Sequence, residues 1–139
     1  LLFAAAPAAQ SQTAADSSAI RAAALDYVEG WYEGNPDRMS RALHPELVKR
    51  IVVTDTATNR SVLDNMGTSS LVNATRRGFG KKTPKEKQQK EVRILDIFAG
   101  AASVKTVMAD WIDYMQLAKV NDRWVIVNVL WAMKPDRAG

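Results

Sequence analysis

The chain has 139 residues, of which 47% are hydrophobic and 24% charged, and its formal net charge is +4. These values are typical of one soluble globular domain. Cysteine is absent and histidine occurs once, at His44, which excludes disulfides, thiolate chemistry, cysteine-based zinc sites and sites with several histidines. No spaced Asp/Glu motif indicates a metal held by carboxylates, and we predict neither a metal nor a cofactor.

The first sixteen residues are predicted to precede the domain. Residues 1–9 resemble the end of the apolar region of a signal peptide, and small residues of the kind that a signal peptidase cuts after lie at this point. We therefore expect a signal-peptide remnant or a disordered leader over 1–16, and a periplasmic or secreted protein. A cytoplasmic protein with a flexible leader is the alternative. The apolar run is too short to span a bilayer.

A single domain is expected over 17–137, and it opens with a helix. Apolar residues recur at helical spacing from Ile20 to Trp31. Ser17 or Ser18 can cap the start of this helix with a side-chain oxygen. The domain is therefore predicted to begin with an amphipathic helix that turns one face toward a core.

A second, shorter helix is predicted to follow directly. Gly34 can end the first helix in a left-handed conformation, and Asn35 can cap a helix whose first residue is Pro36. Pro45 disfavours helical geometry in the residue before it, so we expect this helix to end near His44.

The rest of the chain is predicted to be mainly strands. A β-branched run at 46–55 indicates a strand, and 60–66 is expected to return as its partner or to lead into a helix. A short helix is predicted over 68–78. Gly100 and Asn121-Asp122 mark the hairpin turns of a three-strand antiparallel meander, predicted at 91–100, 101–120 and 122–134. This order of elements indicates an α+β fold.

The positive charge is concentrated in residues 76–93, which hold eight Lys or Arg residues and two Glu residues. Such a segment can bind phosphates, nucleic acid or an anionic membrane surface. However, Phe79 is its only aromatic residue, and the segment matches no nucleic-acid-binding motif. We therefore favour a solvated loop and expect no nucleic-acid partner.

Two segments resemble the nuclear transport factor 2-like superfamily. In "YVEGWYEGNPDRMSRALHPEL", a helix ends in an aromatic-x-Gly-Asn turn and a second helix leads to a His-Pro step, as at the usual opening of that fold. The segment "ASVKTVMADWIDYMQLAKVNDRWVIVNVLW" resembles the closing strands of the putative lumazine-binding group, where Tyr-x-x-Leu, a polar turn and Trp-x-Ile recur. The resemblance covers about 17–133.

This resemblance implies a ketosteroid-isomerase-like architecture. A cone-shaped, curved antiparallel sheet would wrap around the N-terminal helix, with two further short helices and a cavity between sheet and helix. The superfamily includes isomerases, dehydratases, cyclases and binding proteins without catalysis, so the fold does not fix a function.

Aromatic residues of the first helix and the last strands would face each other across such a cavity. The predicted function is that of a small-molecule-binding protein that holds an apolar or aromatic ligand. The alternatives are a proton-transfer lyase or isomerase resembling ketosteroid isomerase or the dehydratases, and an interaction domain without a ligand. The candidate ligand-binding residues are Tyr27, Trp31, His44, Trp111 and Trp131.

Catalytic candidates for the second hypothesis are His44, Asp113 and Tyr27. His44 has the one side chain that ordinarily titrates near neutral pH, although a helix-end histidine bonded to a carbonyl is the favoured interpretation. Asp110 and Asp113 are expected on one long strand, pointing to opposite faces, with a solvent-facing Asp113 favoured. The isomerases use inward acidic groups and a Tyr on the first helix, which Tyr27 matches in part, but their base motif is missing here.

The last strand is apolar on both faces. Strict alternation places Trp124, Ile126, Asn128 and Leu130 on one face, and Val125, Val127, Val129 and Trp131 on the other. One face would line the cavity. A twin subunit is expected to cover the other, giving a homodimer through the outer sheet face, as is common in the superfamily. Packing on a loop is the alternative.

Overall fold

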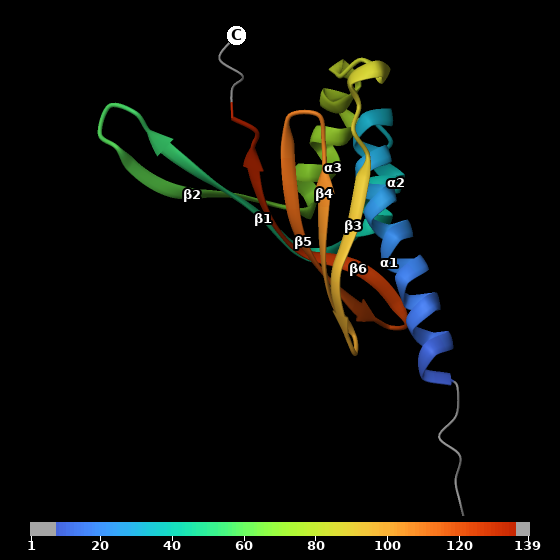
Figure 1. Ribbon diagram of the computed structural model, residues 1–139. Coiled ribbons are helices and arrows are strands. Elements are labelled where there is room, and N and C mark those ends of the chain that lie inside the picture. Colours follow the sequence, from blue (N-terminus) through green and yellow to red (C-terminus); the bar gives the residue numbers. More distant parts are fainter. Residues whose placement is uncertain (1–7, 136–139) are drawn as a thin grey trace, which may run out of the picture.

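The computed structural model describes residues 8–135 (Figure 1). Helices and strands follow one another in this part of the chain as α1 (Ala8–Glu33), α2 (Pro36–Ala42), β1 (Leu43–Asp55), β2 (Arg60–Gly67), α3 (Thr68–Arg76), the 3-10 helices η1 (Phe79–Lys82) and η2 (Lys85–Lys87), β3 (Glu91–Phe98), β4 (Ala101–Val107), β5 (Trp111–Val120) and β6 (Arg123–Met133).

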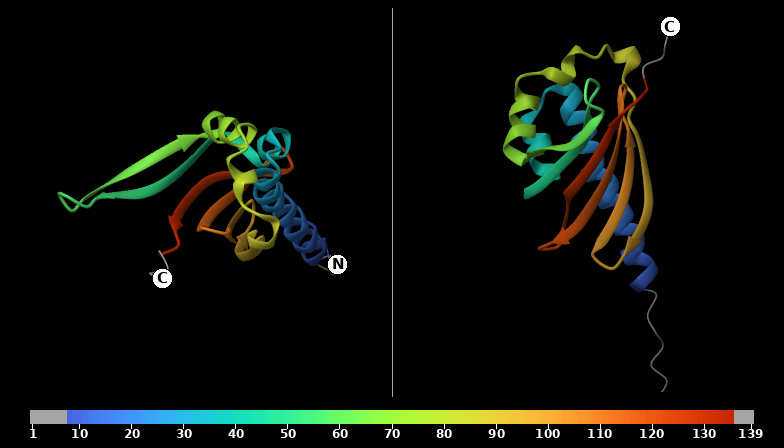
Figure 2. Two further views of the ribbon diagram at one scale, coloured as in Figure 1. Left: turned by 90° about the horizontal axis from the view of Figure 1, so that it is seen from above. Right: turned by 90° about the vertical axis from the view of Figure 1, so that its left-hand side faces the viewer.

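The six strands form one open, curved sheet in the order β2-β1-β6-β5-β4-β3. The helices pack on one face of this sheet, and the long β1–β2 hairpin projects beyond them (Figure 2). The expected α+β class, with a sheet curved against the N-terminal helix, is confirmed. The sheet is mixed rather than wholly antiparallel, because β1 pairs with β6 in parallel. These two strands are joined through the whole intervening chain, so no tight turn forces them to run in opposite directions.

The long second segment of the predicted meander, 101–120, is two strands rather than one. The backbone N–H of Met108 donates to the carbonyl of Trp111 at 2.9 Å, which closes a turn between β4 and β5. The turn contains Ala109 and Asp110 but no glycine, proline or asparagine, so the usual sequence signals of a turn are missing there. The prediction of one bent strand over 101–120 was therefore wrong.

The helix ends and the other hairpin turns form as expected. Gly34 has a φ of +65° at the end of α1, and the Asn35 side chain accepts hydrogen bonds from two backbone N–H groups of α2. Gly100 lies in the turn between β3 and β4. Asn121 and Asp122 have φ angles of 50° and 61°, as a two-residue type I′ hairpin requires.

Helix α1 begins earlier than the Ser17 cap predicts, at Ala8. The carboxylate of Asp16 accepts hydrogen bonds from Trp124 Nε1 at 2.9 Å and from Lys119 Nζ at 3.2 Å, which joins this part of α1 to β6 and β5. Residues 1–7 lie outside the described part, and the leader assigned to 1–16 stays a prediction. Within residues 8–135, no helix is long and apolar enough to cross a membrane.

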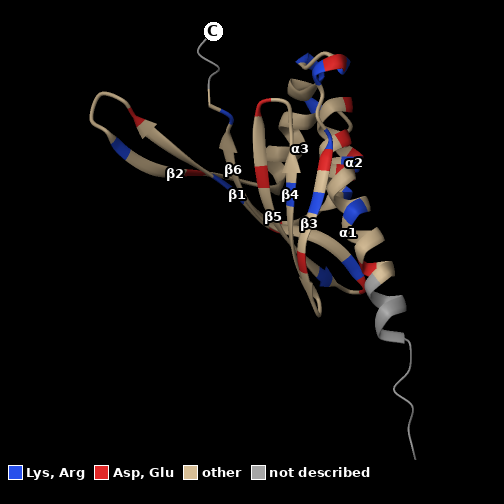
Figure 3. Cartoon of the chain, in the orientation of Figure 1, with Lys and Arg blue, Asp and Glu red and all other residues tan. Residues whose placement is uncertain are grey.

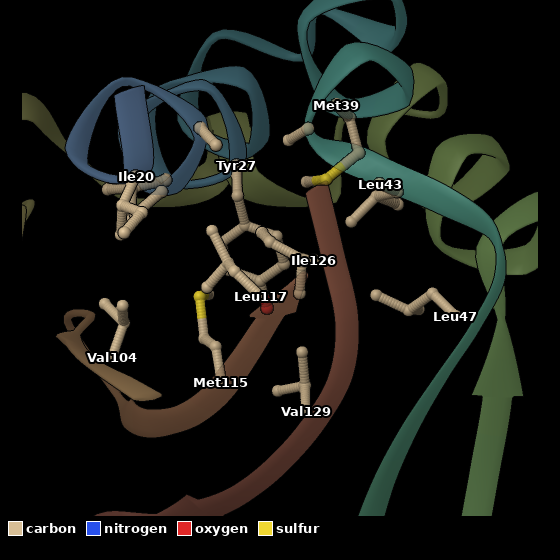
Figure 4. Close-up of a cluster of buried hydrophobic side chains, with 14 of the residues drawn as sticks. Ile20, Tyr27, Met39, Leu43, Leu47, Val104, Met115, Leu117, Ile126 and Val129 are labelled. Atoms are coloured by element: carbon tan, nitrogen blue, oxygen red, sulfur yellow. The ribbon is translucent and has the colours of Figure 1, made fainter. Parts of the chain in front are cut away.

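The core lies between α1 and the inner face of the sheet. The ring of Tyr27 lies among Met115, Leu117 and Ile126, and all four side chains are buried (Figure 4). Helix α1 thereby carries a tyrosine hydroxyl to the inner surface of the central strands.

A bulge changes which residues of β6 face inward. The pairing of β6 with β5 shifts register at Val127, so Ile126 and Val129 are both buried, at 0% and 2% exposure. Asn128 and Leu130 lie on the outer face and are exposed. The strict alternation predicted from the sequence was therefore wrong beyond this point, because one extra residue in the strand reverses the faces.

Candidate ligand-binding site

A buried carboxylate lies at the centre of the inner sheet face. Asp113 on β5 is 0% exposed. Its Oδ1 accepts a hydrogen bond from the Tyr27 hydroxyl at 3.1 Å, and its Oδ2 accepts from the Thr106 hydroxyl at 3.1 Å and from Trp111 Nε1 at 3.0 Å. The expectation of a solvent-facing Asp113 was therefore wrong. The turn after β4 places this carboxylate beside Thr106 on the inner face.

The partner in charge is Lys49 on β1, which sequence reasoning missed. Its Nζ lies 3.3 Å from Asp113 Oδ1 and donates to the Tyr27 hydroxyl, and the residue is 4% exposed. The alternation of Leu47, Lys49 and Ile51 along β1 was the available signal, because Leu47 is buried on the same face.

Three aromatic faces surround the same ammonium group. Lys49 Nζ lies 4.7 Å from the ring centroid of Trp131, 5.2 Å from that of Tyr27 and 5.5 Å from that of Trp111. Cation–π attraction and the Asp113 carboxylate together replace the water that a lysine normally keeps.

Burial controls the ionisation of this cluster. Desolvation lowers the pKa of Lys49, and the charge of Asp113 and its hydrogen bond oppose that change. Desolvation also raises the pKa of Tyr27 well above its ordinary value, and the Asp113 carboxylate adds to that effect. Tyr27 therefore stays protonated, and its hydroxyl donates a hydrogen bond to Asp113.

Lys49 also borders a cavity of about 120 Å³. Trp31 and Trp111 meet edge to face at 5.9 Å, and Trp111 and Trp131 do so at 5.8 Å, so the three indoles form a continuous wall. Side chains from α3 and β2 complete the lining, which consists of Trp31, Lys49, Met66, Leu71, Ala74, Trp111 and Trp131. We call this space the tryptophan cavity.

Two of the side chains that line the tryptophan cavity, Lys49 and Trp131, carry hydrogen-bond donors. The Nε1–H of Trp131 is buried and has no hydrogen-bond partner within residues 14–135. Lys49 Nζ has polar contacts with Tyr27 and Asp113 in the same part of the chain, which leaves one of its three protons uncommitted. An unpaired buried donor costs free energy, so a ligand with an acceptor atom would gain from both groups.

His44 lies elsewhere. It is at the start of β1, where its Nδ1 accepts a hydrogen bond from the backbone N–H of Glu46 at 3.0 Å. The sequence predicts that His44 ends a helix and bonds to a carbonyl. It lies instead at the start of a strand and accepts a hydrogen bond from a backbone N–H. Of the predicted site residues, the structure brings together Tyr27, Trp31, Asp113, Trp111 and Trp131.

The basic segment 76–93 connects the end of α3 to the start of β3 and contains η1 and η2. Its Lys and Arg side chains are exposed, with acidic residues between them (Figure 3). Gly80 is buried against the backbone of Trp31, so the segment also supports one wall of the tryptophan cavity. Within residues 8–135, no group of three His, Cys, Asp or Glu side chains could hold a metal ion.

Comparison with known proteins identifies one family. The family profile described as "Putative lumazine-binding" matches residues 15–132. No curated protein matches the chain at a significant level.

Solved structures share the fold. An NTF2-like protein of unknown function from Shewanella baltica is 20% identical, with a TM-score of 0.67 over 88% of this chain and 97% of that one. An NTF2-like protein of unknown function from Silicibacter pomeroyi is 13% identical, with a TM-score of 0.64 over 88% and 98%. An NTF2-like protein with a cystatin-like fold from Novosphingobium aromaticivorans is 10% identical, with a TM-score of 0.67 over 94% and 90%. At these identities the likeness concerns the fold alone.

Proposed function

The chain belongs to the putative lumazine-binding family within the NTF2-like superfamily, and on this basis we propose that it binds a small molecule in the tryptophan cavity. The observation that carries the proposal is an otherwise apolar cavity whose lining includes two side chains with donors, Lys49 and Trp131, and Trp131 Nε1 has no partner among the described residues. A ligand that fits is small, flat and apolar or aromatic, with a carbonyl-type acceptor. A dry protein cavity of about 150 Å³ accommodates benzene, and the space here is smaller, at about 120 Å³, so it limits the ligand to about one ring.

The buried polar network supports binding rather than the abstraction of a proton from a substrate. Asp113 does not line the tryptophan cavity, and its oxygens already accept from Tyr27, Thr106 and Trp111. The hydroxyl of Tyr27 donates to Asp113 and accepts from Lys49, so it is not free to polarise a carbonyl. We infer that this network positions Lys49, and we prefer this role to the lyase or isomerase hypothesis.

Tryptophan fluorescence tests the proposal directly, because Trp31, Trp111 and Trp131 border the cavity. We expect acetophenone, which has a carbonyl acceptor, to change the emission saturably. Ethylbenzene has nearly the same shape without the acceptor and should bind about tenfold more weakly, the ratio that one hydrogen bond of about 1.4 kcal/mol provides. Lumazine itself is a third probe.

A pair of matched variants locates the binding site. Ala74→Met fills the cavity with a flexible side chain and should abolish the response, whereas Ala22→Met on the exposed face of α1 should leave it unchanged. Emission that is indifferent to all three compounds in the wild-type protein, or an equal response in the Ala74→Met variant, would count against a ligand in this cavity.

We also propose that a second copy of the chain covers the outer sheet face. A groove of about 660 Å³ lies on that face, and large apolar side chains that border it are about half exposed: Val52, Leu63, Leu95, Tyr114 and Leu130. Contiguous apolar surface of this kind marks interaction sites. Arg50 is the one charged side chain among the described residues that line the groove, so two such faces can meet with little repulsion between like charges.

A further inference from the structure

Lys49 combines three properties in one side chain. The side chain lines the tryptophan cavity, it is almost wholly withdrawn from water, and its Nζ contacts the protonated hydroxyl of Tyr27. A desolvated lysine beside an apolar cavity is a nucleophile for carbonyl compounds. We propose that Lys49 condenses with the carbonyl carbon of a small aromatic or apolar aldehyde in the cavity and forms a Schiff base. The inference rests on the proposed function, because the carbonyl compound must first enter the tryptophan cavity.

The reaction needs no partner besides the amine and the aldehyde. After the ammonium loses one proton, the nitrogen lone pair attacks the carbonyl carbon, and the C=O π pair moves to the oxygen, which takes up a proton. The nitrogen, which is cationic after the attack, then loses a second proton. The carbinolamine hydroxyl takes up that proton and leaves as water while the nitrogen lone pair forms the C=N bond. From ammonium and aldehyde to iminium and water, the total charge stays at one positive unit.

This charge balance fits the surroundings of Lys49. The Asp113 carboxylate at 3.3 Å and the faces of Trp131 and Trp111 stabilise a cationic nitrogen before the reaction. An iminium nitrogen is cationic at the same place, so the same groups stabilise the product. The site therefore does not lose its ion pair when the bond forms.

A proton route is also present. Tyr27 accepts a hydrogen bond from Lys49 and donates one to Asp113, so its hydroxyl can take a proton from the nitrogen side while passing its own proton to the carboxylate. Burial lowers the pKa of Lys49 and thereby raises the fraction of free amine near neutral pH. Tyr27 acts here as a positioning and proton-relay group.

Reductive trapping of the wild-type protein tests the inference. The protein is incubated at pH 7 with benzaldehyde and sodium cyanoborohydride, which reduces an iminium to a stable benzylamine, and the modified lysine is then located by peptide mass mapping. We expect one benzyl group on Lys49, formed faster than on the exposed lysines, because the lowered pKa of Lys49 leaves a larger fraction of its amine unprotonated at pH 7. The exposed Lys81, Lys82 and Lys85 are the internal reference. Benzylation confined to the exposed lysines would overturn the inference.

Two comparisons separate this inference from the proposed function. Lys49→Arg keeps a positive charge for Asp113 but cannot form an imine, and it should lose the adduct. Ala74→Met should lose the adduct and acetophenone binding alike. Wild-type protein that binds acetophenone but leaves Lys49 unmodified by benzaldehyde would overturn the Schiff-base inference alone. Wild-type protein that does neither would overturn both, and this comparison does not depend on any variant folding.

Discussion

Lys49 Nζ and Asp113 Oδ1 lie 3.3 Å apart, although their side chains are only 4% and 0% exposed. Lys49 is on β1 and Asp113 is on β5, and β6 lies between these strands in the sheet. Two charges withdrawn from water are tolerated only when they are paired and hydrogen-bonded, as Tyr27 and Thr106 ensure here. The ion pair therefore crosses the central strand and depends on the correct packing of all three strands.

Breaking this pair from one side should be costly. Asp113→Asn keeps the shape of the side chain but leaves the Lys49 charge buried without compensation. We expect the free energy of unfolding to fall by about 3–5 kcal/mol, measured by urea denaturation at pH 7. The control Asp110→Asn changes an exposed carboxylate in the turn directly before β5 and should cost less than about 0.5 kcal/mol. A loss below about 1 kcal/mol for Asp113→Asn would show that the pair is not held as described.

The helices could be predicted from the sequence because their signals are local. The spacing of Ile20, Tyr27 and Trp31 identified the buried face of α1, and the Gly34-Asn35 step identified both its end and the cap of α2. The aromatic wall followed from the concentration of Trp and Tyr in two segments. These features are fixed by residues that are neighbours in the chain.

Lys49 and the faces of β6 could not be assigned in the same way. A lysine is almost always exposed, and what permits its burial here is Asp113, a residue remote in sequence. The inward direction of Trp131 depends on the bulge at Val127, and nothing in the alternating pattern indicates that the strand skips a residue there. Both features arise from strand pairing, which a single sequence does not display.

A side chain at Gly80 should disturb the wall of the tryptophan cavity. A Cβ on Gly80 would lie 2.1 Å from the carbonyl oxygen of Trp31 and 2.6 Å from its Cδ1, closer than atoms can approach. We expect Gly80→Ala to displace η1 or Trp31 and to lower the free energy of unfolding by about 1–3 kcal/mol, measured by urea denaturation with tryptophan emission as the signal. At Gly100 the nearest atom to an added Cβ is 3.7 Å away, so Gly100→Ala is the matched control and should fold normally. Equal stabilities for the two variants would contradict the close contact.

Trp131→Phe should affect ligands that carry an acceptor. The change removes the unpaired Nε1–H and keeps an aromatic face beside Lys49. The affinity for acetophenone should fall about tenfold, whereas that for ethylbenzene should change much less, as measured by fluorescence titration. Trp124→Phe is the control, because the Trp124 indole donates to Asp16 and does not border the tryptophan cavity. An equal loss for both ligands would mean that Trp131 acts through packing alone.

Leu130→Glu should dissociate the proposed dimer. Leu130 is 52% exposed and borders the outer groove, so a carboxylate there would face its own copy across an isologous interface. Light scattering should give the mass of two chains for the wild type and of one chain for the variant. Phe98→Glu replaces a more exposed apolar residue, at 82%, outside that groove and should not change the mass. A wild-type protein that is already monomeric at micromolar concentration would contradict the proposed interface.

The junction of α1 and α2 should respond to pH through Asp26. Its carboxylate accepts from Arg38 Nε at 3.0 Å and from two nitrogens of Arg41 at 2.9 Å, and the hydrogen bond from Arg41 is the main cause that holds the pKa of Asp26 below its ordinary value of 3.8. A carboxyl whose pKa is lower in the folded state binds fewer protons there than in the unfolded chain. Its contribution to stability is therefore present above about pH 3.8 and is lost as the pH falls through the folded-state pKa.

Asp26→Asn should consequently cost about 1 kcal/mol at pH 6, a value typical of a partly exposed ion pair, and progressively less below pH 3.8. Urea denaturation of the variant and of the wild type at pH 6 and at pH 2 measures this difference in the free energy of unfolding. Asp64→Asn changes an exposed carboxylate on strand β2 and is the control. It should be as stable as the wild type at pH 6, so lowering the pH has no difference between the two proteins to remove. If the gap between Asp26→Asn and the wild type were as large at pH 2 as at pH 6, the ionised carboxylate would not be what joins the two helices.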